Sequence, residues 1–155
     1  MADVSGSLKL HYIVPGDDYT RAGEASAQVK QALRKLGLSP QIIRRVSIAM
    51  YEGEINMVIH ANGGEIDVNI DPVRISIVLR DTGPGILDID LAMKEGYSTA
   101  TEKVRSMGFG AGMGLPNIKK HSDYMKIESS PGAGTTVFID IVIAEIVEIV
   151  EKNEA

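Results

Sequence analysis

Residues 52–56 read Glu52-Gly53-Glu54-Ile55-Asn56, and they lie in a stretch whose apolar residues recur at helical spacing. Glu52 and Asn56 are four positions apart, which places both side chains on one face of the helix. A carboxylate beside a carboxamide can accept a proton and can ligate a hard cation through oxygen. An exposed polar face has the same spacing. The helix is apolar over much of its surface, however, so the pair is a candidate site.

Other polar residues of this helix are expected to stay outside the chemistry. Glu54 lies two positions from Glu52, so it points away and is expected to face solvent or a partner. His60 is expected to be a packed or capping residue, because no second His or Cys lies nearby to complete a metal cluster. By the same reasoning, His11 and His121 are expected at the surface.

Outward from residues 52–56, the chain alternates between strand and helix patterns. We expect a strand at 8–14, helices beginning at Asp17–Asp18 and at Ser39–Pro40, strands at 65–70 and 73–79, a short helix at 89–94, a helix at 115–124, and strands at 125–129 and 135–143. This order predicts an α/β (α+β) sandwich, in which helices cover one face of a mostly antiparallel sheet.

Two glycine-rich segments stand out in the second half. Asp81 follows an apolar strand directly, and there it can accept a hydrogen bond from an exocyclic amine such as that of adenine. Gly83 and Gly85 let the backbone approach a ligand closely. Four more glycines precede a helix, where free amides and the helix N-terminus can form a phosphate cradle: Gly108, Gly110, Gly112 and Gly114. Alone, the first segment is more typical of a turn, and the second is also compatible with a hinge.

The bulk properties are those of one domain over residues 1–155, with 144–155 as an acidic C-terminal extension. The chain carries a net charge of −5 and no basic block, which argues against direct binding of nucleic acid. It has no cysteine, which excludes disulfides and thiolate metal sites. No run approaches the roughly 20 apolar residues that span a bilayer, and residues 1–7 do not resemble a signal peptide. We therefore expect a cytoplasmic protein without a membrane partner.

The order of these motifs is more specific than any one of them. Glu52 and Asn56, then 81–85, then 110–114, then Gly134-Thr135-Thr136 resemble the asparagine box, two glycine boxes and threonine box of the GHKL ATPase superfamily. The resemblance covers about 8–143. The small size, the glutamate at 52 and the runs 96–100 and 129–136 resemble the stand-alone bacterial anti-sigma factor serine kinases and related switch kinases.

This resemblance implies a Bergerat-type ATP-binding fold and a protein serine/threonine kinase that uses ATP and Mg²⁺. Glu52 would receive the proton of a protein serine hydroxyl, and Asn56 would ligate the magnesium ion. Asp81 would hold the adenine amino group, with Thr135 supporting it. The glycines that would make room for the nucleotide at the adenine are Gly83 and Gly85.

The second glycine box is implied to close over the phosphates. Its wrapping residues would be Gly108, Gly110, Gly112 and Gly114. Residues 97–107 would form a mobile lid, from which Lys103 or Arg105 would reach a phosphate.

The resemblance also implies partners. The kinase would phosphorylate a serine of an anti-anti-sigma (STAS-type) protein and sequester a sigma factor. Two alternatives stay open: a switch kinase that acts on a signalling scaffold and activates a phosphatase, and a non-catalytic ATP-gated binding module. Pro116 resembles the switch kinases as much as the sigma-binding kinases. A homodimer is expected, because the strand at 8–14 would otherwise leave unpaired backbone groups.

Overall fold

A computed structural model describes residues 6–16, 18–96 and 114–143 of the chain. Five strands form one antiparallel sheet in the order β1-β2-β3-β5-β4. The strands are β1 (Leu8–Pro15), β2 (Gly63–Ile70), β3 (Arg74–Arg80), β4 (Tyr124–Ser130) and β5 (Gly134–Val142). The helices are α1 (Glu24–Lys35), α2 (Pro40–His60), the short α3 (Ile89–Ala92) and α5 (Gly114–His121), with a 3₁₀ turn, η1, at Tyr19–Arg21.

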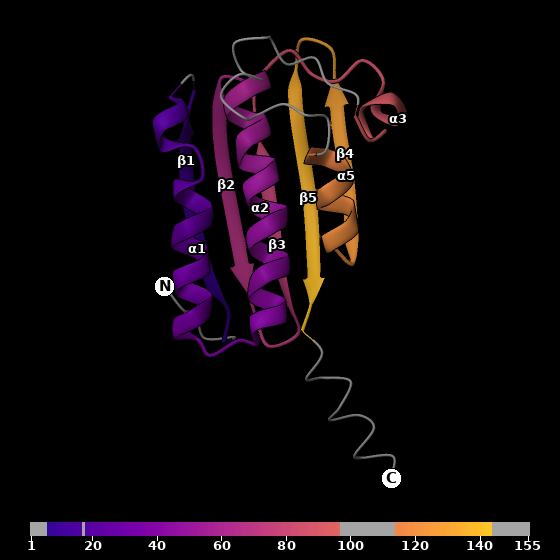
Figure 1. Ribbon diagram of the computed structural model, residues 1–155. Helices are drawn as coiled ribbons and strands as arrows, with labels where there is room; N and C mark the ends of the chain where they lie inside the picture. Colours follow the sequence, from indigo (N-terminus) through magenta and orange to yellow (C-terminus); the bar gives the residue numbers. More distant parts are fainter. Residues whose placement is uncertain (1–5, 17, 97–113, 144–155) are drawn as a thin grey trace.

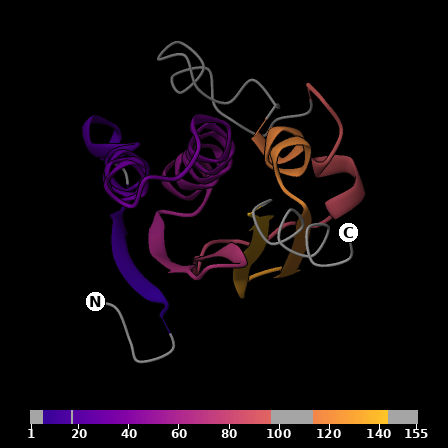
Figure 2. The ribbon, with the colours of Figure 1, turned by 90° about the horizontal axis from the view of Figure 1, so that it is seen from below.

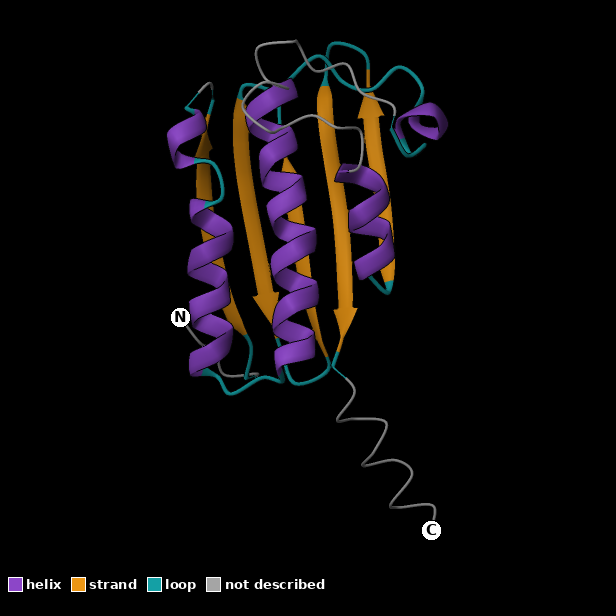
Figure 3. Cartoon of the chain, in the orientation of Figure 1, coloured by secondary structure: helices purple, strands orange, loops and turns teal. Residues whose placement is uncertain are grey.

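Helices α1, α2 and α5 lie side by side over the same face of the sheet, with α2 in the middle (Figures 1 and 2). Figure 3 shows the two layers as helices in front of strands. The predicted sandwich is therefore confirmed, and each expected element is present, all but the first helix within a few residues of its predicted bounds.

The core fills the space between the two layers. Strands β2, β3 and β5 alternate between buried and more exposed residues, which gives the sheet one apolar face for the helices. The residues with at most 1 % of their surface exposed are Val29, Leu33, Val46, Ala49, Met50, Val58, Ile66, Val68, Ile75, Ile77, Ile118, Ile139 and Ile141. In the described part of the chain, no helix is both long enough and apolar enough to cross a membrane.

The first helix begins later than expected. Asp18 precedes only η1, and α1 starts at Glu24 after Gly23, whose φ of 92° lies in the left-handed region that favours glycine. Asp17 lies outside the described residues. Ser39, in contrast, caps α2 as expected, and its hydroxyl accepts a hydrogen bond from the Ile42 amide at 3.3 Å.

Strand β1 forms one edge of the sheet and pairs only with β2 among the described strands. Ile13 points away from the helices and is 72 % exposed. The strand therefore lies at an edge of the described sheet, as the sequence pattern predicts.

Candidate functional site

The candidate residues gather at one end of the molecule, the upper end in Figure 1. The C-terminal half of α2, the end of β3, the start of β5 and the start of α5 meet there. This follows from the antiparallel order, because β3 ends where β5 begins: Arg80 pairs with Thr136.

Asp81 is held rigidly at the end of β3. Its Oδ1 accepts hydrogen bonds from the amides of Gly83 and Thr135, each at 3.0 Å, and its own amide donates to the Thr135 carbonyl at 2.9 Å. Its second oxygen, Oδ2, has no hydrogen-bond partner within the described ranges. The carboxylate is thus oriented through one oxygen, while the other can accept a proton donor from a ligand.

The backbone around Asp81 tolerates no side chains at its glycines. A Cβ on Gly83 would lie 2.6 Å from the Ala61 Cα at the end of α2. Gly85 has a φ of 81°, and a Cβ there would lie 2.2 Å from the Ser130 carbonyl oxygen. The two glycines therefore allow this segment to pack closely against α2 and β4. The predicted close approach of a ligand at Gly83 and Gly85 stays a prediction.

Thr135 and Ser129 brace the same segment from two adjacent strands. Thr135 is 9 % exposed and contacts Asp81 through its backbone amide, not through its hydroxyl. The Ser129 Oγ lies 2.8 Å from the Thr135 Oγ1 and accepts a hydrogen bond from the Ile86 amide at 2.7 Å. The sequence interpretation gave Ser129 no role, because only the sheet register brings it beside Thr135.

Glu52 and Asn56 lie on the face of α2 that meets α5. The Asn117 Nδ2 of α5 donates to the Glu52 Oε1 at 3.3 Å. A Cβ on Gly114 would lie 3.0 Å from the Nδ2 and Oδ1 atoms of Asn56, so α5 begins directly beside that amide. The sequence did not predict a role for Asn117, because an asparagine in a helix gives no indication of its partner.

Gly53 sets the depth of this face. A Cβ at that position would lie 2.6 Å from the Leu79 Cδ2 on β3. Because Gly53 has no Cβ, α2 packs closely on β3, the strand that precedes Asp81. This packing sets how far Glu52 and Asn56 lie from the sheet.

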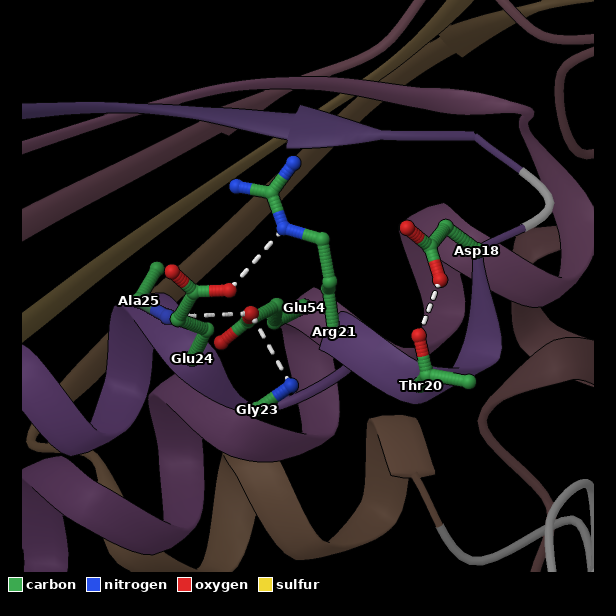
Figure 4. Close-up of polar contacts among 7 residues, drawn as sticks. All are labelled: Asp18, Thr20, Arg21, Gly23, Glu24, Ala25 and Glu54. Atoms are coloured by element: carbon green, nitrogen blue, oxygen red, sulfur yellow. Dashed lines mark hydrogen bonds and ion pairs between the residues drawn. The ribbon is translucent and has the colours of Figure 1, made fainter.

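The expectation that Glu54 faces solvent or a partner is wrong. Its residue surface is 2 % exposed, and its carboxylate points at the start of α1 (Figure 4). Oε2 accepts hydrogen bonds from the amides of Gly23 at 3.0 Å and Ala25 at 3.2 Å. Oε1 accepts from the Ser26 amide at 2.9 Å and from the Ser26 hydroxyl at 2.6 Å. Glu54 does point away from Glu52, but the direction it takes is toward a packed helix.

The three histidines lie apart from one another. His60 is partly buried at the end of α2, and burial lowers its pKa below the usual value. The His11 Nδ1 lies 2.6 Å from the Asp67 Oδ1 on the open face of the sheet. The His121 Nδ1 lies 2.9 Å from the Asn117 carbonyl oxygen.

Several predicted positions lie outside the described residues. They are Gly108, Gly110, Gly112, the lid at 97–107 with Lys103 and Arg105, and the acidic extension at 144–155. Gly114 is the one member of the second glycine box that the structure places.

The arrangement suits a magnesium ion that a nucleotide brings with it, not a metal held by the protein alone. In residues 6–16, 18–96 and 114–143, no group of three or more His, Cys, Asp or Glu side chains could hold a metal ion. Mg²⁺ commonly takes one or two protein oxygens and completes its shell with phosphate and water oxygens. Asn56 offers such an oxygen beside the start of α5, where a helix N-terminus favours anions.

Comparisons with known proteins agree with this geometry. Residues 41–145 match the family model "Histidine kinase-, DNA gyrase B-, and HSP90-like ATPase". The serine/threonine-protein kinase RsbT of Bacillus subtilis is 30% identical over 112 residues, which cover 70% of this chain and 78% of RsbT. An anti-sigma F factor of Thermoanaerobacter sp. (strain X514) is 32% identical over 121 residues, which cover 74% and 81%.

The fold also matches a solved structure. The mycobacterial sensor histidine kinase MprB superposes with a TM-score of 0.51 at 16% identity, over 87% of this chain and 97% of that structure. This likeness concerns the fold alone. The matched family model and the two relatives show that this chain belongs to the histidine kinase-, DNA gyrase B- and HSP90-like ATPase family, in the group of the anti-sigma F factors and the RsbT kinase.

Proposed function

We propose that this protein is a serine/threonine-protein kinase that uses ATP and Mg²⁺ and acts as an anti-sigma factor. It phosphorylates a serine of a STAS-type anti-anti-sigma protein and sequesters a sigma factor. The observation that carries the proposal is that these residues lie at the same end of the molecule: Glu52 and Asn56 face α5, and the Asp81 carboxylate is oriented by the amides of Gly83 and Thr135. The names of the anti-sigma F factor and RsbT relatives support the same activity.

Asp81 determines the base of the nucleotide. Its Oδ2 accepts a hydrogen bond from the amino group of adenine, because Oδ1 is already taken by the amides of Gly83 and Thr135. Gly83 and Gly85 let the segment after Asp81 pack against α2 and β4, and this packing holds Asp81 in place for the adenine ring. The phosphates extend from there toward Asn56 and the N-terminus of α5. Gly114 places no side chain between that N-terminus and Asn56.

Glu52 acts as the general base. The oxygen of the substrate serine attacks the γ-phosphorus, the bond from that phosphorus to the β–γ bridging oxygen breaks, and ADP leaves with the electron pair. The serine proton passes to the Glu52 carboxylate. Phosphoryl transfer depends mainly on positioning and charge neutralisation, and Mg²⁺ held by Asn56 supplies part of that neutralisation when it is bound.

A second candidate is a switch kinase that phosphorylates a signalling scaffold and then activates a phosphatase. RsbT is named a serine/threonine-protein kinase and not an anti-sigma factor, and it matches over 78% of its length, against 81% for the anti-sigma F factor. A non-catalytic ATP-gated binding module would need Asp81 and Asn56 but no base, so Glu52 speaks against it.

We also propose that residues 1–155 form a single domain and that the protein is a homodimer. The position of β1 at an edge of the described sheet, with Ile13 exposed, supports pairing of two copies. Light scattering on the purified full chain measures the assembly directly, and a mass of one chain at all concentrations contradicts the dimer.

The test is phosphate transfer from labelled ATP to a panel of STAS-type proteins, with wild type and Glu52→Gln side by side. We expect transfer to fall at least about 100-fold in Glu52→Gln, because general-base catalysis contributes roughly 10²–10⁴. Binding of ATP should change less than about threefold. Glu65→Gln is the matched control, since Glu65 is exposed on β2.

Three outcomes separate the candidates. Transfer by wild type and by Glu65→Gln, but not by Glu52→Gln, supports the kinase. Equal transfer by wild type and Glu52→Gln removes Glu52 as the base. Tight ATP binding without transfer to any STAS-type protein or scaffold leaves the binding module as the better description.

A further inference from the structure

Helices α2 and α5 pack antiparallel along a line of three close approaches, two of which are hydrogen bonds. On α2 the contacting residues are Arg45, Glu52 and Asn56, at spacings of seven and four that keep them on one face. On α5 their partners are His121, Asn117 and Gly114, in reverse order. The candidate base and the candidate metal ligand therefore both lie on the interface with α5.

The far end of this interface anchors α5. The Arg45 Nε donates to the carbonyl oxygen of His121 at 3.1 Å, and its Nη2 pairs with the Asp123 Oδ2 at 3.2 Å. A cation at a helix C-terminus also interacts favourably with the helix dipole. Ile118 is fully buried in the core, which fixes the rotation of α5 about its axis. With its axial position and rotation both held, the helix can present Asn117 to α2 only in one direction.

Asn117 is the group that donates to Glu52 within the described part of the chain. The bond engages Oε1 and leaves Oε2 for another donor. A glutamate side chain otherwise moves freely about several bonds, and a general base must lie within hydrogen-bond reach of the proton that it accepts.

We propose that Asn117 is a positioning residue: its amide holds the Glu52 carboxylate by Oε1 so that Oε2 receives the proton of the substrate serine. This inference rests on the proposed function, in which Glu52 is the base. It also gives α5 a second role besides its N-terminus, because a displacement of the helix moves the base and the surroundings of Asn56 together.

Three substitutions of Asn117 test the proposal. Asn117→Leu removes the donor at similar volume, Asn117→Asp places a second carboxylate there, and Asn117→Gln keeps an amide. We expect kcat for phosphate transfer to fall about 10- to 100-fold in the Leu and Asp variants, because a misplacement of about 1 Å can cost that much. KM for ATP should change less than about threefold, and Asn117→Gln should recover part of kcat.

Lys120→Ala is the control, since Lys120 is exposed on the same helix. A purely structural role for Asn117 predicts that the apolar Leu variant keeps wild-type kcat, and this result would overturn the proposal. A fall in kcat and rise in KM of equal size in all three variants, with a lowered unfolding midpoint, would overturn it as well.

A second readout does not need kinase activity. The side-chain amide protons of Asn117 give a resolved pair of NMR signals in the ¹⁵N-labelled chain, and these signals should shift when Glu52 is replaced by Gln. Unchanged signals overturn the positioning role whatever the enzyme assay shows. Shifted signals without phosphate transfer by the wild type support the contact and instead contradict the proposed kinase function.

Discussion

At the scale of single residues, the two oxygens of Asp81 have different surroundings. Oδ1 accepts two backbone amides, and no described residue contacts Oδ2 by a hydrogen bond. A carboxylate with one oxygen occupied by the protein is rigid, so its free oxygen is a specific acceptor and not merely a negative charge. This difference allows a substitution that changes the ligand contact but keeps the fold.

The Asp81→Asn variant should lose affinity for adenine nucleotides selectively. The asparagine oxygen can still accept from Gly83 and Thr135, while its NH₂ group takes the place of Oδ2 and faces the amino group of adenine. Two opposed donors should raise the Kd for ATP about 100-fold, or roughly 2.7 kcal/mol. Guanine offers an oxygen at the corresponding ring position, so the preference for ATP over GTP should shrink at least about tenfold.

Calorimetric titration with both nucleotides measures this preference. Circular dichroism of the variant serves as the control for folding. An equal loss of ATP and GTP affinity would contradict the role of Asp81 and would point instead to a damaged segment.

At the scale of elements, Glu54 joins two helices. It lies on α2, yet its carboxylate receives the first free amides of α1 and the hydroxyl of Ser26 (Figure 4). The N-terminus of a helix leaves amides without intrahelical partners, and a carboxylate satisfies both their hydrogen bonds and the helix dipole. Gly23 has no side chain for a cap, so α1 depends on its neighbour for this function.

Glu54→Gln should destabilise the fold by about 2–3 kcal/mol, because the new NH₂ group would face donors and leave buried amides without acceptors. Urea unfolding measures the change. Glu24→Gln is the matched control at the start of the same helix, where Glu24 pairs with Arg21 at 3.0 Å on the exposed surface and its loss should change the stability far less. Equal effects of the two substitutions would mean that Glu54 contributes no more than a surface charge.

At the scale of the whole molecule, packing of the helical layer on the sheet decides which titratable groups are buried. The end of α2 comes close to the segment after β3, where Gly83 meets Ala61, and His60 is partly buried there. Burial lowers the pKa of His60, so its neutral form is favoured in the folded state. On the open face of the sheet, hydrogen bonds from His11 and Arg80 lower the pKa of Asp67.

These shifts predict where acid weakens the fold. Below about pH 6.5, His60 becomes protonated in the unfolded chain but not in the folded chain. The free energy of unfolding therefore decreases as the pH is lowered, until the pH reaches the lower pKa of the folded state. His60→Gln should reduce the slope of unfolding free energy between pH 7 and 5 by up to about 1.4 kcal/mol per pH unit. The contribution of Asp67 is fully present above its unfolded pKa near 4 and is lost only below it, outside this range.

Urea unfolding at several pH values between 5 and 7.5 gives this slope, and a constant m-value shows that the unfolding reaction is unchanged. An identical slope in wild type and His60→Gln would contradict the prediction.

The sequence by itself determined the elements and their order. Periodicity, the Ser39 cap and the glycine-containing turns are local properties, so α2 and the five strands could be predicted from neighbours in the chain. The pairing of Glu52 with Asn56 on one face is local as well, since it follows from helical spacing alone.

Only the tertiary structure decided which polar groups meet. Glu54 and Ser26, Asn117 and Glu52, and Ser129 and Thr135 are brought together by helix packing and strand register, and no sequence pattern specifies those angles and shifts. A polar residue in a helix looks the same in sequence whether it faces water or a partner. Its environment depends on the element packed against it, which is why the buried carboxylate of Glu54 and the donor to Glu52 became visible only in the folded chain.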